Sequence, residues 1–391
     1  MSALKGLRVL DLSRVLAGPW AGQLLADLGA SVVKVERPES GDDTRAWGPP
    51  YMCDDAGEVT AESAYYLCAN RGKRSITVDL SAPEGQARLR ELAASADVVL
   101  ENFKLGGAAQ YGLDYDSLRE INPGLVYCSI TGFGQTGPLA ARPGYDFMIQ
   151  ALGGLMSITG APDDELGAGP QKVGVALTDI MTGLYATIGV LAALREREHS
   201  GLGQHVDLAL LDVTAASLAN QATNFLVGGF VPGRLGNAHP NIVPYQTFRA
   251  SDREFVVAVG NDKQFNALAA VLGEPSLSID HRFSSNGARV KNRDTLCELL
   301  AKKFRERTAA EWLATMEEHG IPGGPINRID ELFAEPQLRA RDMIVSVDHP
   351  QKSSLQLVGN PIKLSRTPVR YDRPPPRLGE HDTLSDSELW D

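Results

Sequence analysis

The order of strands and helices in the first 200 residues is the feature that most limits how this chain can fold. A short apolar strand at 6–13 (GLRVLDLS) is followed by a helix at 18–29 and a second strand at 31–36 (SVVKVE). The helix-then-strand pattern recurs at 84–103 and at 115–134. Strands that are almost entirely apolar are typical of parallel sheets that helices cover on both faces. The sequence therefore predicts an α/β fold in which a large domain holds a doubly wound, Rossmann-like parallel sheet.

The rest of the chain predicts a second, smaller α+β domain. A segment rich in Gly, Pro and Asn at 224–245 indicates a linker or loop. A new strand–helix unit follows at 254–273, and two amphipathic helices at 292–320 are divided near Thr308. We expect the proline-rich segment 373–382 to pack back on the large domain. The expected organisation is a large domain at 1–205 that is completed by 365–391, a linker helix at 206–224, a small domain at 225–330 and a return linker at 331–364.

Charge and cysteine usage narrow the class of protein. The formal net charge of -11 argues against bulk binding to nucleic acid or to an anionic membrane surface. No run of about 18 apolar residues occurs, and the first residues lack the apolar core of a signal peptide, so we expect no membrane span and no leader. The four cysteines are scattered without a CxxC pair, which favours a reducing compartment and a cytoplasmic protein: Cys53, Cys68, Cys128 and Cys297.

Three familiar kinds of chemistry find no support in the motifs. The turn after the first strand (DLSRVLAGPWAG, 11–22) holds only Gly18 and Gly22, so it lacks the GxGxxG spacing of a nicotinamide-dinucleotide site, although Glu36 ends the second strand where a ribose-binding acid belongs. The seven histidines do not form a metal-binding pair with an intervening acid, and no GxSxG nucleophile elbow occurs. We expect no metal and no tightly bound cofactor.

A cluster of cations is open to two interpretations. The segment NRGKRS (70–75) places Arg71, Lys73 and Arg74 together before a predicted strand. It is either a solvated turn or a phosphate clamp, because guanidinium and ammonium groups bind phosphate through charge-assisted hydrogen bonds. Arg37 and Arg45 follow the second strand, on the edge where doubly wound sheets bind ligands, which favours the clamp. The acidic neighbours Glu39, Asp42 and Asp43 argue against it.

A solitary acid near the start of an apolar helix is the second ambiguous feature. Asp179 lies in the apolar stretch 173–196, and Gly183 and Ala186 share its helical face. We expect these small residues to leave space above the carboxylate. One interpretation is that Asp179 or Thr178 caps the helix. The other is that Asp179 is a nucleophile that forms a covalent acyl intermediate. The residue types alone do not decide between them.

Several segments together resemble the class III coenzyme A transferases, the CaiB/BaiF family that includes formyl-CoA transferase and carnitine CoA transferase. The resemblance covers essentially the whole chain. The segments SRVLAGP (13–19) and AHPNIVPYQ (238–246) look closest to the succinyl-CoA–glutarate CoA transferase subgroup. The matching stretches lie at 10–45, 70–80, 96–103 (ADVVLENF), 127–138 (YCSITGFGQTGP), 144–160, 178–194 (TDIMTGLYATIGVLAAL), 238–248 and 321–327 (IPGGPIN).

The resemblance implies roles for individual residues. It makes Asp179 the nucleophile, and it places Tyr145 and Asp146 beside the reacting ester. It assigns CoA binding to the large domain, and it puts Gln110 where formyl-CoA transferase has a phosphate-binding arginine. The other implied CoA contacts are Val15, Leu16, Ala17, Arg37, Asn70, Arg71, Gly72, Lys73, Asn102, Phe103 and Lys104.

The second substrate needs a site of its own. A dicarboxylic acceptor needs a cation for its distal carboxylate, for which Arg14, Arg45 and Arg142 are candidates. His239 lies in a glycine-rich segment that is either a lid over the substrate or a plain linker.

The activity implied by the resemblance is transfer of CoA from an acyl-CoA donor, such as succinyl-CoA, to a carboxylic and preferably dicarboxylic acid. The reaction would pass through an aspartyl-CoA thioester, with CoA as a substrate and an interlocked homodimer as the assembly. Two alternatives remain: an α-methylacyl-CoA racemase or epimerase, and a CoA-binding protein without activity. Racemases of the family have a histidine where this chain has Tyr145, and a phenol with a pKa near 10 is a poor proton-exchange group at neutral pH.

Overall fold

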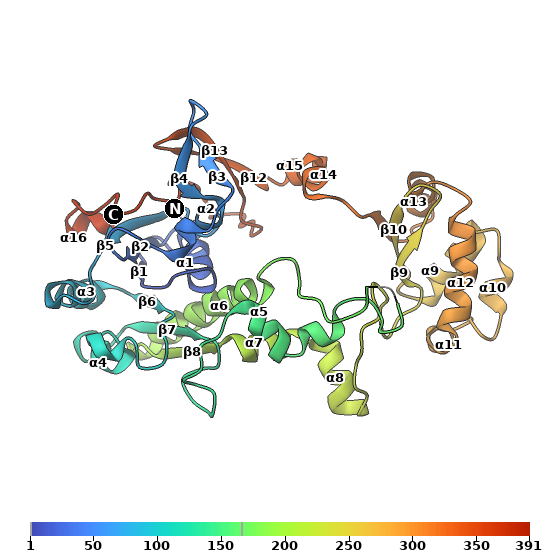
Figure 1. The fold of residues 1–391 in the computed structure, drawn as a ribbon, viewed down its shortest axis with the longest axis horizontal. Helices are drawn as coiled ribbons and strands as arrows, with labels where there is room; N and C mark the ends of the chain where they lie inside the picture. The colour runs from blue at the N-terminus through green and yellow to red at the C-terminus, as the bar shows by residue number, and fades with distance from the viewer. Residues whose placement is uncertain (1, 166) are drawn as a thin grey trace. The chain divides into compact units, whose positions relative to one another are not determined.

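The computed structural model describes residues 2–165 and 167–391, and these residues divide into two compact units (Figure 1). The larger unit comprises the chain up to Leu155, Lys172–Phe230 and Pro336–Asp391. The smaller unit comprises Met156–Gln171 and Val231–Glu335. Each unit therefore contains segments that are far apart in the sequence.

A six-stranded sheet in which all neighbouring strands are parallel forms the centre of the larger unit, in the order β5-β2-β1-β6-β7-β8. The chain moves outward from β1 through β2 to β5 and then returns to the other side of β1 as β6. The strand order therefore reverses between β1 and β6, where open α/β sheets bind ligands at the carboxyl ends of the strands. The strands are β1 (Arg8–Asp11), β2 (Ser31–Glu36), β5 (Lys73–Thr77), β6 (Val98–Glu101), β7 (Val126–Thr131) and β8 (His205–Ala209).

Helices cover both faces of this sheet, which confirms the predicted parallel α/β fold. Val9 and Val32 belong to one buried cluster, whereas the next residues along the strands, Leu10 and Val33, belong to the other. This alternation is the two-residue period of a strand that is buried on both faces. Helices α1 (Ala17–Asp27), α5 (Asp146–Leu152), α6 (Leu177–Ser200) and α7 (Leu210–Ser217) contribute to the first cluster, and α3 (Pro83–Ser95), α4 (Tyr115–Ile121) and α16 (Asp386–Leu389) to the second.

The C-terminal tail runs beside the outer strand of the sheet. The backbone N–H of His381 donates to the carbonyl of Ser75 at 3.0 Å, and the N–H of Thr77 donates to the carboxylate of Asp382 at 2.6 Å. Trp390 packs in the second buried cluster. The tail thus covers the otherwise unpaired edge of β5.

Smaller elements complete the larger unit. The hairpin β3–β4 and the helix α2 that follows it pack against the hairpin β12–β13, through Met52, Tyr66 and Leu67 on one side and Val347 and Leu355 on the other. The remaining elements are η1 (Asp43–Ala46), β3 (Tyr51–Cys53), β4 (Val59–Ser63), α2 (Ala64–Leu67), η2 (Ala109–Tyr111), η3 (Leu155–Ile158, at the unit boundary), α8 (Ala219–Gly228), α15 (Pro336–Ala340), β12 (Ile344–His349) and β13 (Lys352–Val358).

The smaller unit has a three-stranded antiparallel sheet and a helical layer around an aromatic core. Phe304 contacts Phe255 and Trp312 edge to face. Thr308 forms a capping box with Glu311, so one helix ends and the next begins near Thr308, as the sequence predicts. The elements are β9 (Tyr245–Arg249), β10 (Glu254–Ala258), α9 (Asp262–Val271), α10 (Ser276–Ile279), α11 (Asn286–Lys291), α12 (Arg293–Phe304), α13 (Ala309–Glu318), β11 (Gly323–Pro325) and α14 (Ile329–Ala334).

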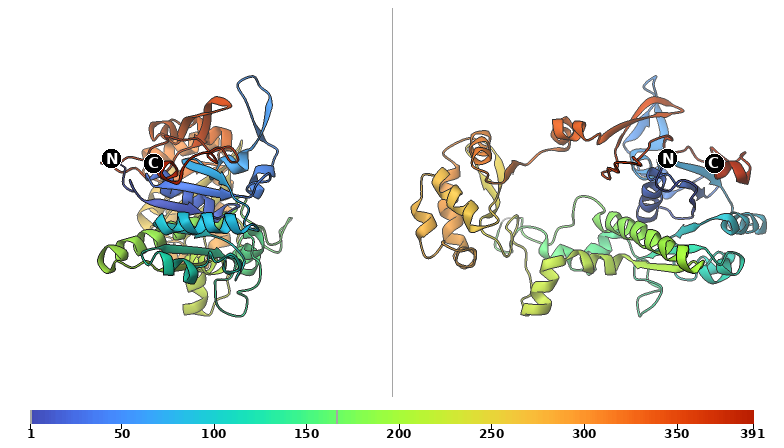
Figure 2. Two further views of the ribbon diagram at one scale, coloured as in Figure 1. Left: turned by 90° about the vertical axis from the view of Figure 1, so that its left-hand side faces the viewer. Right: turned by 180° about the vertical axis from the view of Figure 1, so that it is seen from behind.

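Helix α6 is the one helix among the described residues whose length and composition would allow it to cross a membrane. Figure 2 shows this long green helix from behind, lying along the larger unit. Its side chains Ala186 and Val190 are fully buried in the cluster that also contains Ala17 and Ala21 of α1. In this structure α6 is therefore a core helix of the larger unit.

Candidate active site

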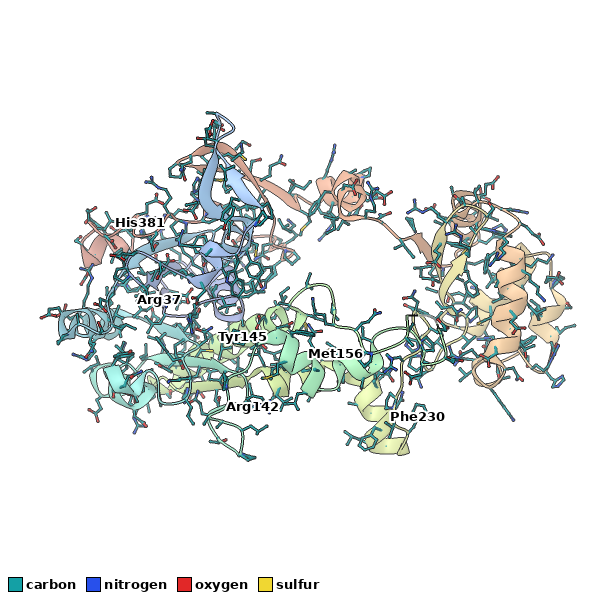
Figure 3. The ribbon with its side chains drawn as sticks, viewed as in Figure 1. Arg37, Arg142, Tyr145, Met156, Phe230 and His381 are labelled. Atoms are coloured by element: carbon teal, nitrogen blue, oxygen red, sulfur yellow. The ribbon has the colours of Figure 1, made fainter. Side chains whose placement is uncertain are left out.

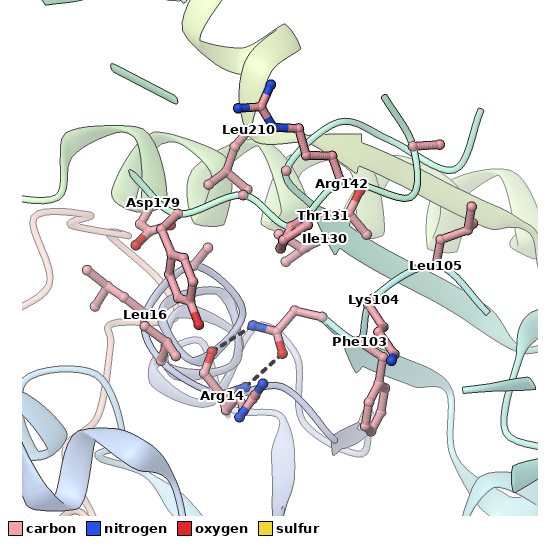
Figure 4. A pocket seen from close by; sticks show the side chains of 18 of the residues that line it. Arg14, Leu16, Phe103, Lys104, Leu105, Ile130, Thr131, Arg142, Asp179 and Leu210 are labelled. Carbon is pink, nitrogen blue, oxygen red and sulfur yellow. Dashed lines mark hydrogen bonds between the residues drawn. The ribbon is translucent and has the colours of Figure 1, made fainter. Parts of the chain in front are cut away.

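A pocket lies at the carboxyl ends of β1, β6 and β7, beside the point where the strand order reverses (Figure 4). Every residue that lines it belongs to the larger unit. The lining residues are Arg14, Val15, Leu16, Ala17, Asn102, Phe103, Lys104, Leu105, Ile130, Thr131, Gly132, Ala140, Ala141, Arg142, Pro143, Gly144, Tyr145, Asp179 and Leu210.

Asp179 reaches this pocket from the first turn of α6. Helix α6 begins after Ala176 without a side-chain cap, so neither Asp179 nor Thr178 caps it, and the capping interpretation is wrong. Within the described part of the chain, the carboxylate of Asp179 has no hydrogen-bond or ion-pair partner. Burial raises its pKa to about 7, and the nearby charge of Asp146 acts in the same direction. Asp179 therefore places a carboxylate at the wall of the pocket, with no partner among the described residues.

The sequence predicts that the small residues on the face of Asp179 leave space above its carboxylate, and this prediction is wrong. A Cβ atom at Gly183 would lie 2.7 Å from the carbonyl oxygen of Ala17 and 3.1 Å from the Cβ of Trp20. Ala186 is fully buried in the core. These residues are small because α6 packs closely on α1, and the pocket lies to one side of that contact.

Asp146 lies next to Asp179 without lining the pocket. One of its carboxylate oxygens accepts the backbone N–H of Thr178 at 2.8 Å, and the other accepts the side-chain amide of Gln150 at 2.7 Å. Tyr145 precedes it, lines the pocket and is 64% exposed (Figure 3). Asp146 thus fixes the start of α6 while Tyr145 is free to contact a ligand.

The loop between β1 and α1 forms one wall of the pocket. Asn102 holds this loop from the end of β6, because its amide accepts the N–H of Arg14 at 3.0 Å and donates to the carbonyl of Arg14 at 2.7 Å (Figure 4). Val15 has a φ of 72°, in the left-handed region. The segments that the resemblance assigns to CoA, Val15–Ala17 and Asn102–Lys104, therefore meet across one pocket.

The predicted contact segment at 70–73 lies beneath this wall. Arg71, Lys73 and Arg74 are all at most 5% exposed, so the interpretation as a solvated turn is wrong. Arg71 pairs with Asp27 at 2.6 Å. Lys73 donates to the carboxylate of Asp11 at 2.9 Å and to the carbonyl of Pro19 at 2.8 Å, and burial lowers its pKa to about 8.

The residues beside these cations, Asn70 and Gly72, are also held by contacts or conformation within the protein. Asn70 is fully buried, with its amide donating to Tyr66 and accepting from Lys73, and Gly72 adopts a left-handed φ of 79°. The structure does not bring the residues at 70–73 into the pocket, and their contact with CoA stays a prediction.

Arg37 and Gln110 also lie outside the pocket, on the surface of the larger unit. Arg37 is 56% exposed and pairs with Asp43 at 2.7 Å (Figure 3). Gln110 is exposed and donates to the carbonyl of Gly107 at 2.9 Å. A long nucleotide could reach exposed groups of this kind, and their role stays a prediction.

The candidate cations for a second carboxylate fall into different environments. Arg45 is buried between Glu36 and Glu62 and does not line the pocket. Arg14 lines it but pairs with Asp43 at 2.7 Å.

Arg142 lines the pocket and has no acidic partner among the described residues. It contacts the Phe133 ring at 5.6 Å and the sulfur of Met148 at 3.8 Å. His239 belongs to the smaller unit, where its ring packs against Tyr245.

Sequence reasoning missed the part of the wall that β7 supplies. Thr131 ends this strand and Gly132 follows it, and a Cβ on Gly132 would lie 2.6 Å from the Cα of Gly144. The signal was available, because the end of a strand beside β6 must lie on the same edge of the sheet. Tyr65 on α2 was also missed; burial raises its pKa to about 12, and the charge of Asp179 contributes to this shift.

Comparison with known proteins identifies the chain. Residues 4–382 match the family model "CoA-transferase family III". The chain is 51% identical over 386 residues to succinate–glutarate CoA-transferase of Agrobacterium fabrum, covering 99% of this chain and 95% of that protein. It is 43% identical over 380 residues to the human succinyl-CoA:glutarate CoA-transferase, covering 97% and 84%. A crystal structure of a CAIB/BAIF family protein from Brucella suis superposes with a TM-score of 0.86 at 51% identity, covering 99% of both chains. The chain therefore belongs to CoA-transferase family III and is a CoA-transferase.

Proposed function

We propose that this enzyme transfers CoA from an acyl-CoA donor such as succinyl-CoA to a dicarboxylic acid, through a covalent intermediate on Asp179. The relatives named for succinate, glutarate and other acids support transfer between carboxylic acids. The observation that carries the proposal is the carboxylate of Asp179 at the wall of the pocket, which has no hydrogen-bond or ion-pair partner among the described residues.

The proposed reaction has four steps that balance. The carboxylate of Asp179 attacks the donor thioester, which forms a mixed anhydride and releases CoA thiolate. The thiolate attacks the aspartyl carbonyl, which releases the donor acid and leaves an aspartyl-CoA thioester. The acceptor carboxylate attacks this thioester and gives a second mixed anhydride and CoA thiolate. The thiolate then attacks the acceptor's acyl carbon, which forms the new acyl-CoA and regenerates Asp179. Each step divides a difficult exchange into easier ones.

The electrostatics of Asp179 suit this role. A carboxylate must be ionised to attack, and a pKa of about 7 leaves roughly half of the groups ionised at neutral pH. The same shift makes the ionised carboxylate more basic than an exposed aspartate, which strengthens it as a nucleophile. Burial, with the added charge of Asp146, produces both effects.

We assign the distal carboxylate of a dicarboxylic substrate to Arg142. It lines the pocket with Asp179 and has no acidic partner in the described ranges 2–165 and 167–391, whereas Arg14 and Arg45 are already paired with acids. A free guanidinium can bind a carboxylate through two parallel hydrogen bonds. This assignment makes Arg142 the residue that distinguishes dicarboxylic from monocarboxylic substrates.

We assign CoA binding to the larger unit. In this proposal Val15–Ala17 and Asn102–Lys104 contact CoA directly, Lys104 supplies a positive charge for a phosphate, and Arg37 lies toward the nucleotide. The buried Lys73 acts indirectly, by holding the carbonyl of Pro19 in the first turn of α1. Gln110 is the least favourable of the assigned contacts, because an amide carries no charge for a phosphate.

We also propose that the enzyme acts in the cytoplasm as an interlocked homodimer. The free cysteines support a reducing compartment. Phe225, Leu226 and Val227 on α8 are at least 50% exposed, and such apolar patches mark interfaces.

The covalent step is tested by incubating the enzyme with a panel of acyl-CoA donors, succinyl-CoA first, and trapping with hydroxylamine. Mass spectrometry of the peptides is expected to find a hydroxamate on Asp179 in the wild type and none in Asp179→Asn. A folded wild type that turns over substrate without this adduct would overturn the covalent mechanism.

A further inference from the structure

Val15 has a backbone conformation that its side chain disfavours. Its φ of 72° lies in the left-handed region, which β-branched residues rarely adopt. Of the four described non-glycine residues with positive φ, it is the one that lines the pocket. Holding such a conformation costs folding free energy and requires surrounding contacts that fix it. The wall of the pocket therefore contains a strained residue whose support can be traced.

A buried ion pair supplies that support. The two carboxylate oxygens of Asp42 lie 3.2 and 3.3 Å from the backbone nitrogen of Val15 and accept its N–H. Lys34 donates to Asp42 at 2.8 Å and to the carbonyl of Ser13 at 2.9 Å. The side chains of Lys34 and Asp42 are at most 1% exposed. Thr44 donates to Asp42 through its N–H at 3.0 Å and through its hydroxyl at 2.8 Å. Lys34 and Thr44 thus fix the position of the Asp42 carboxylate that accepts the N–H of Val15.

The strained residue precedes the first turn of α1 at the pocket. The helix begins at Ala17 without a side-chain cap. The N–H groups of Leu16 and Ala17 have no acceptor in the described part of the chain, as is usual for a first turn. Both residues line the pocket together with Asp179. The direction of these two N–H groups is set by the turn at Val15 immediately before them.

We propose that Asp42, held by Lys34, is a positioning residue that imposes the left-handed turn at Val15 and so aligns the free amides of Leu16 and Ala17 with the acyl carbonyl that Asp179 attacks. The inference rests on the proposed function of Asp179. Fixed N–H donors at a carbonyl that gains negative charge stabilise the transition state more than the bound substrate. Asp42 therefore acts on kcat more than on KM, although it does not contact the substrate.

The decisive experiment is a double-mutant cycle between Asp42 and Val15, with transfer of CoA from succinyl-CoA to glutarate as the assay. Asp42→Asn alone is expected to lower kcat roughly 10- to 100-fold with a smaller change in KM, because a shift of the reacting groups by about 1 Å costs up to about 100-fold. Glycine adopts positive φ readily, so in the Val15→Gly background the same change is expected to cost roughly threefold or less. Equal losses in both backgrounds would overturn the proposal.

Asp97→Asn is the matched control. Asp97 accepts one backbone N–H, that of Arg8 at 2.9 Å, and binds one cation, Arg197 at 2.8 Å, at the opposite edge of the same sheet. We expect this variant to keep the wild-type kcat. A tenfold loss in Asp97→Asn would show that any disturbed ion pair lowers activity, and would overturn the positioning role.

A second variant decides the question if Asp42→Asn does not fold. Val15→Gly alone is expected to raise the melting temperature by a few degrees, because glycine adopts the left-handed conformation without the strain of a β-branched side chain. A lower melting temperature would show that Val15 is not strained, and would overturn the inference. A different result would overturn the proposed function: the wild type would form no hydroxamate on Asp179.

Discussion

Asp146 accepts the backbone N–H of Thr178 at 2.8 Å, directly before Asp179, so the two acids lie close together, and neither forms an ion pair among the residues that the structure describes. Burial raises the pKa of Asp179 to about 7, and the charge of Asp146 adds to that effect. The carboxylate of Asp146 accepts hydrogen bonds from Thr178 and Gln150, which fix its position. One acid thus keeps its proton close to neutral pH while its neighbour is held in place, a division of roles that two carboxylates in different surroundings often adopt.

The pH dependence of the reaction follows from this pair. We expect kcat/KM to rise with pH and to level off above about pH 7, because the attacking carboxylate must lose its proton. Asp146→Asn removes one of the two causes that raise the pKa, so the rising limb should move toward lower pH. Measurement of kcat/KM between about pH 5 and pH 9 with the wild type and this variant checks both statements. A limb that stays in place in Asp146→Asn would contradict the assignment.

The same shift predicts that the catalytic acid destabilises the fold. The pKa of Asp179 is raised in the folded protein from the ordinary value of 3.8 to about 7, so stability falls as the pH rises between these two values. Asp179→Asn lacks this loss and should unfold with a free energy higher by on the order of 1–3 kcal/mol at about pH 8, a gain that disappears near pH 4. Urea unfolding at the two pH values measures it.

The control for this stability difference is an aspartate on the protein surface that is exposed to solvent. Asp116 is 79% exposed, and Asp116→Asn should change the free energy of unfolding by at most about 0.5 kcal/mol at either pH. If Asp179→Asn showed no more pH-dependent gain than Asp116→Asn, the raised pKa of Asp179 would be wrong.

Selection of the acceptor should depend on Arg142. Arg142→Gln keeps a polar side chain but removes the charge, so the KM for glutarate should rise roughly 10- to 100-fold, as for the loss of a hydrogen bond to a charged group. The KM for valerate, a monocarboxylic acid of the same chain length, should change little. Steady-state kinetics with both acceptors measures the ratio.

Arg14→Gln is the comparison variant for Arg142, because Arg14 lines the same pocket but is already paired with Asp43. It should leave the preference for glutarate over valerate nearly unchanged. A loss of that preference in Arg14→Gln, with Arg142→Gln unaffected, would transfer the role to Arg14.

The sequence allowed the parallel sheet to be predicted because local patterns carry it. Apolar strands such as SVVKVE at 31–36 and the helices between them identify a sheet that is covered on both faces. The sequence also predicted ligand binding at the carboxyl edge of this sheet, and the pocket lies at that edge beside β1 and β6. The resemblance then pointed to Val15–Ala17, Asn102–Lys104, Tyr145 and Asp179, and the structure gathers these residues around one pocket.

The partners of buried charges could not be predicted from local patterns. Lys34 interrupts an apolar strand, and nothing nearby in the sequence indicates that it forms a fully buried pair with Asp42. Arg45 was a candidate for substrate binding, yet it lies between Glu36 and Glu62. Which groups meet inside a protein depends on the tertiary arrangement, which local periodicity does not contain.

The close contact of α6 with α1 gives the last prediction. A Cβ on Gly183 would lie 2.7 Å from the backbone oxygen of Ala17, which cannot move without shifting α1 and the pocket wall. Gly183→Ala should therefore lower the free energy of unfolding by about 1–3 kcal/mol, even though alanine favours a helix over glycine by up to about 1 kcal/mol. It should also reduce kcat, since Asp179 and Ala17 lie on the two separated helices. Gly189→Ala in the same helix would meet only the Val206 methyl group at 2.9 Å, which can rotate, so this variant should be neutral or more stable. Urea unfolding and kcat of both variants decide the matter, and equal behaviour would show that the helix contact at Gly183 does not set the pocket.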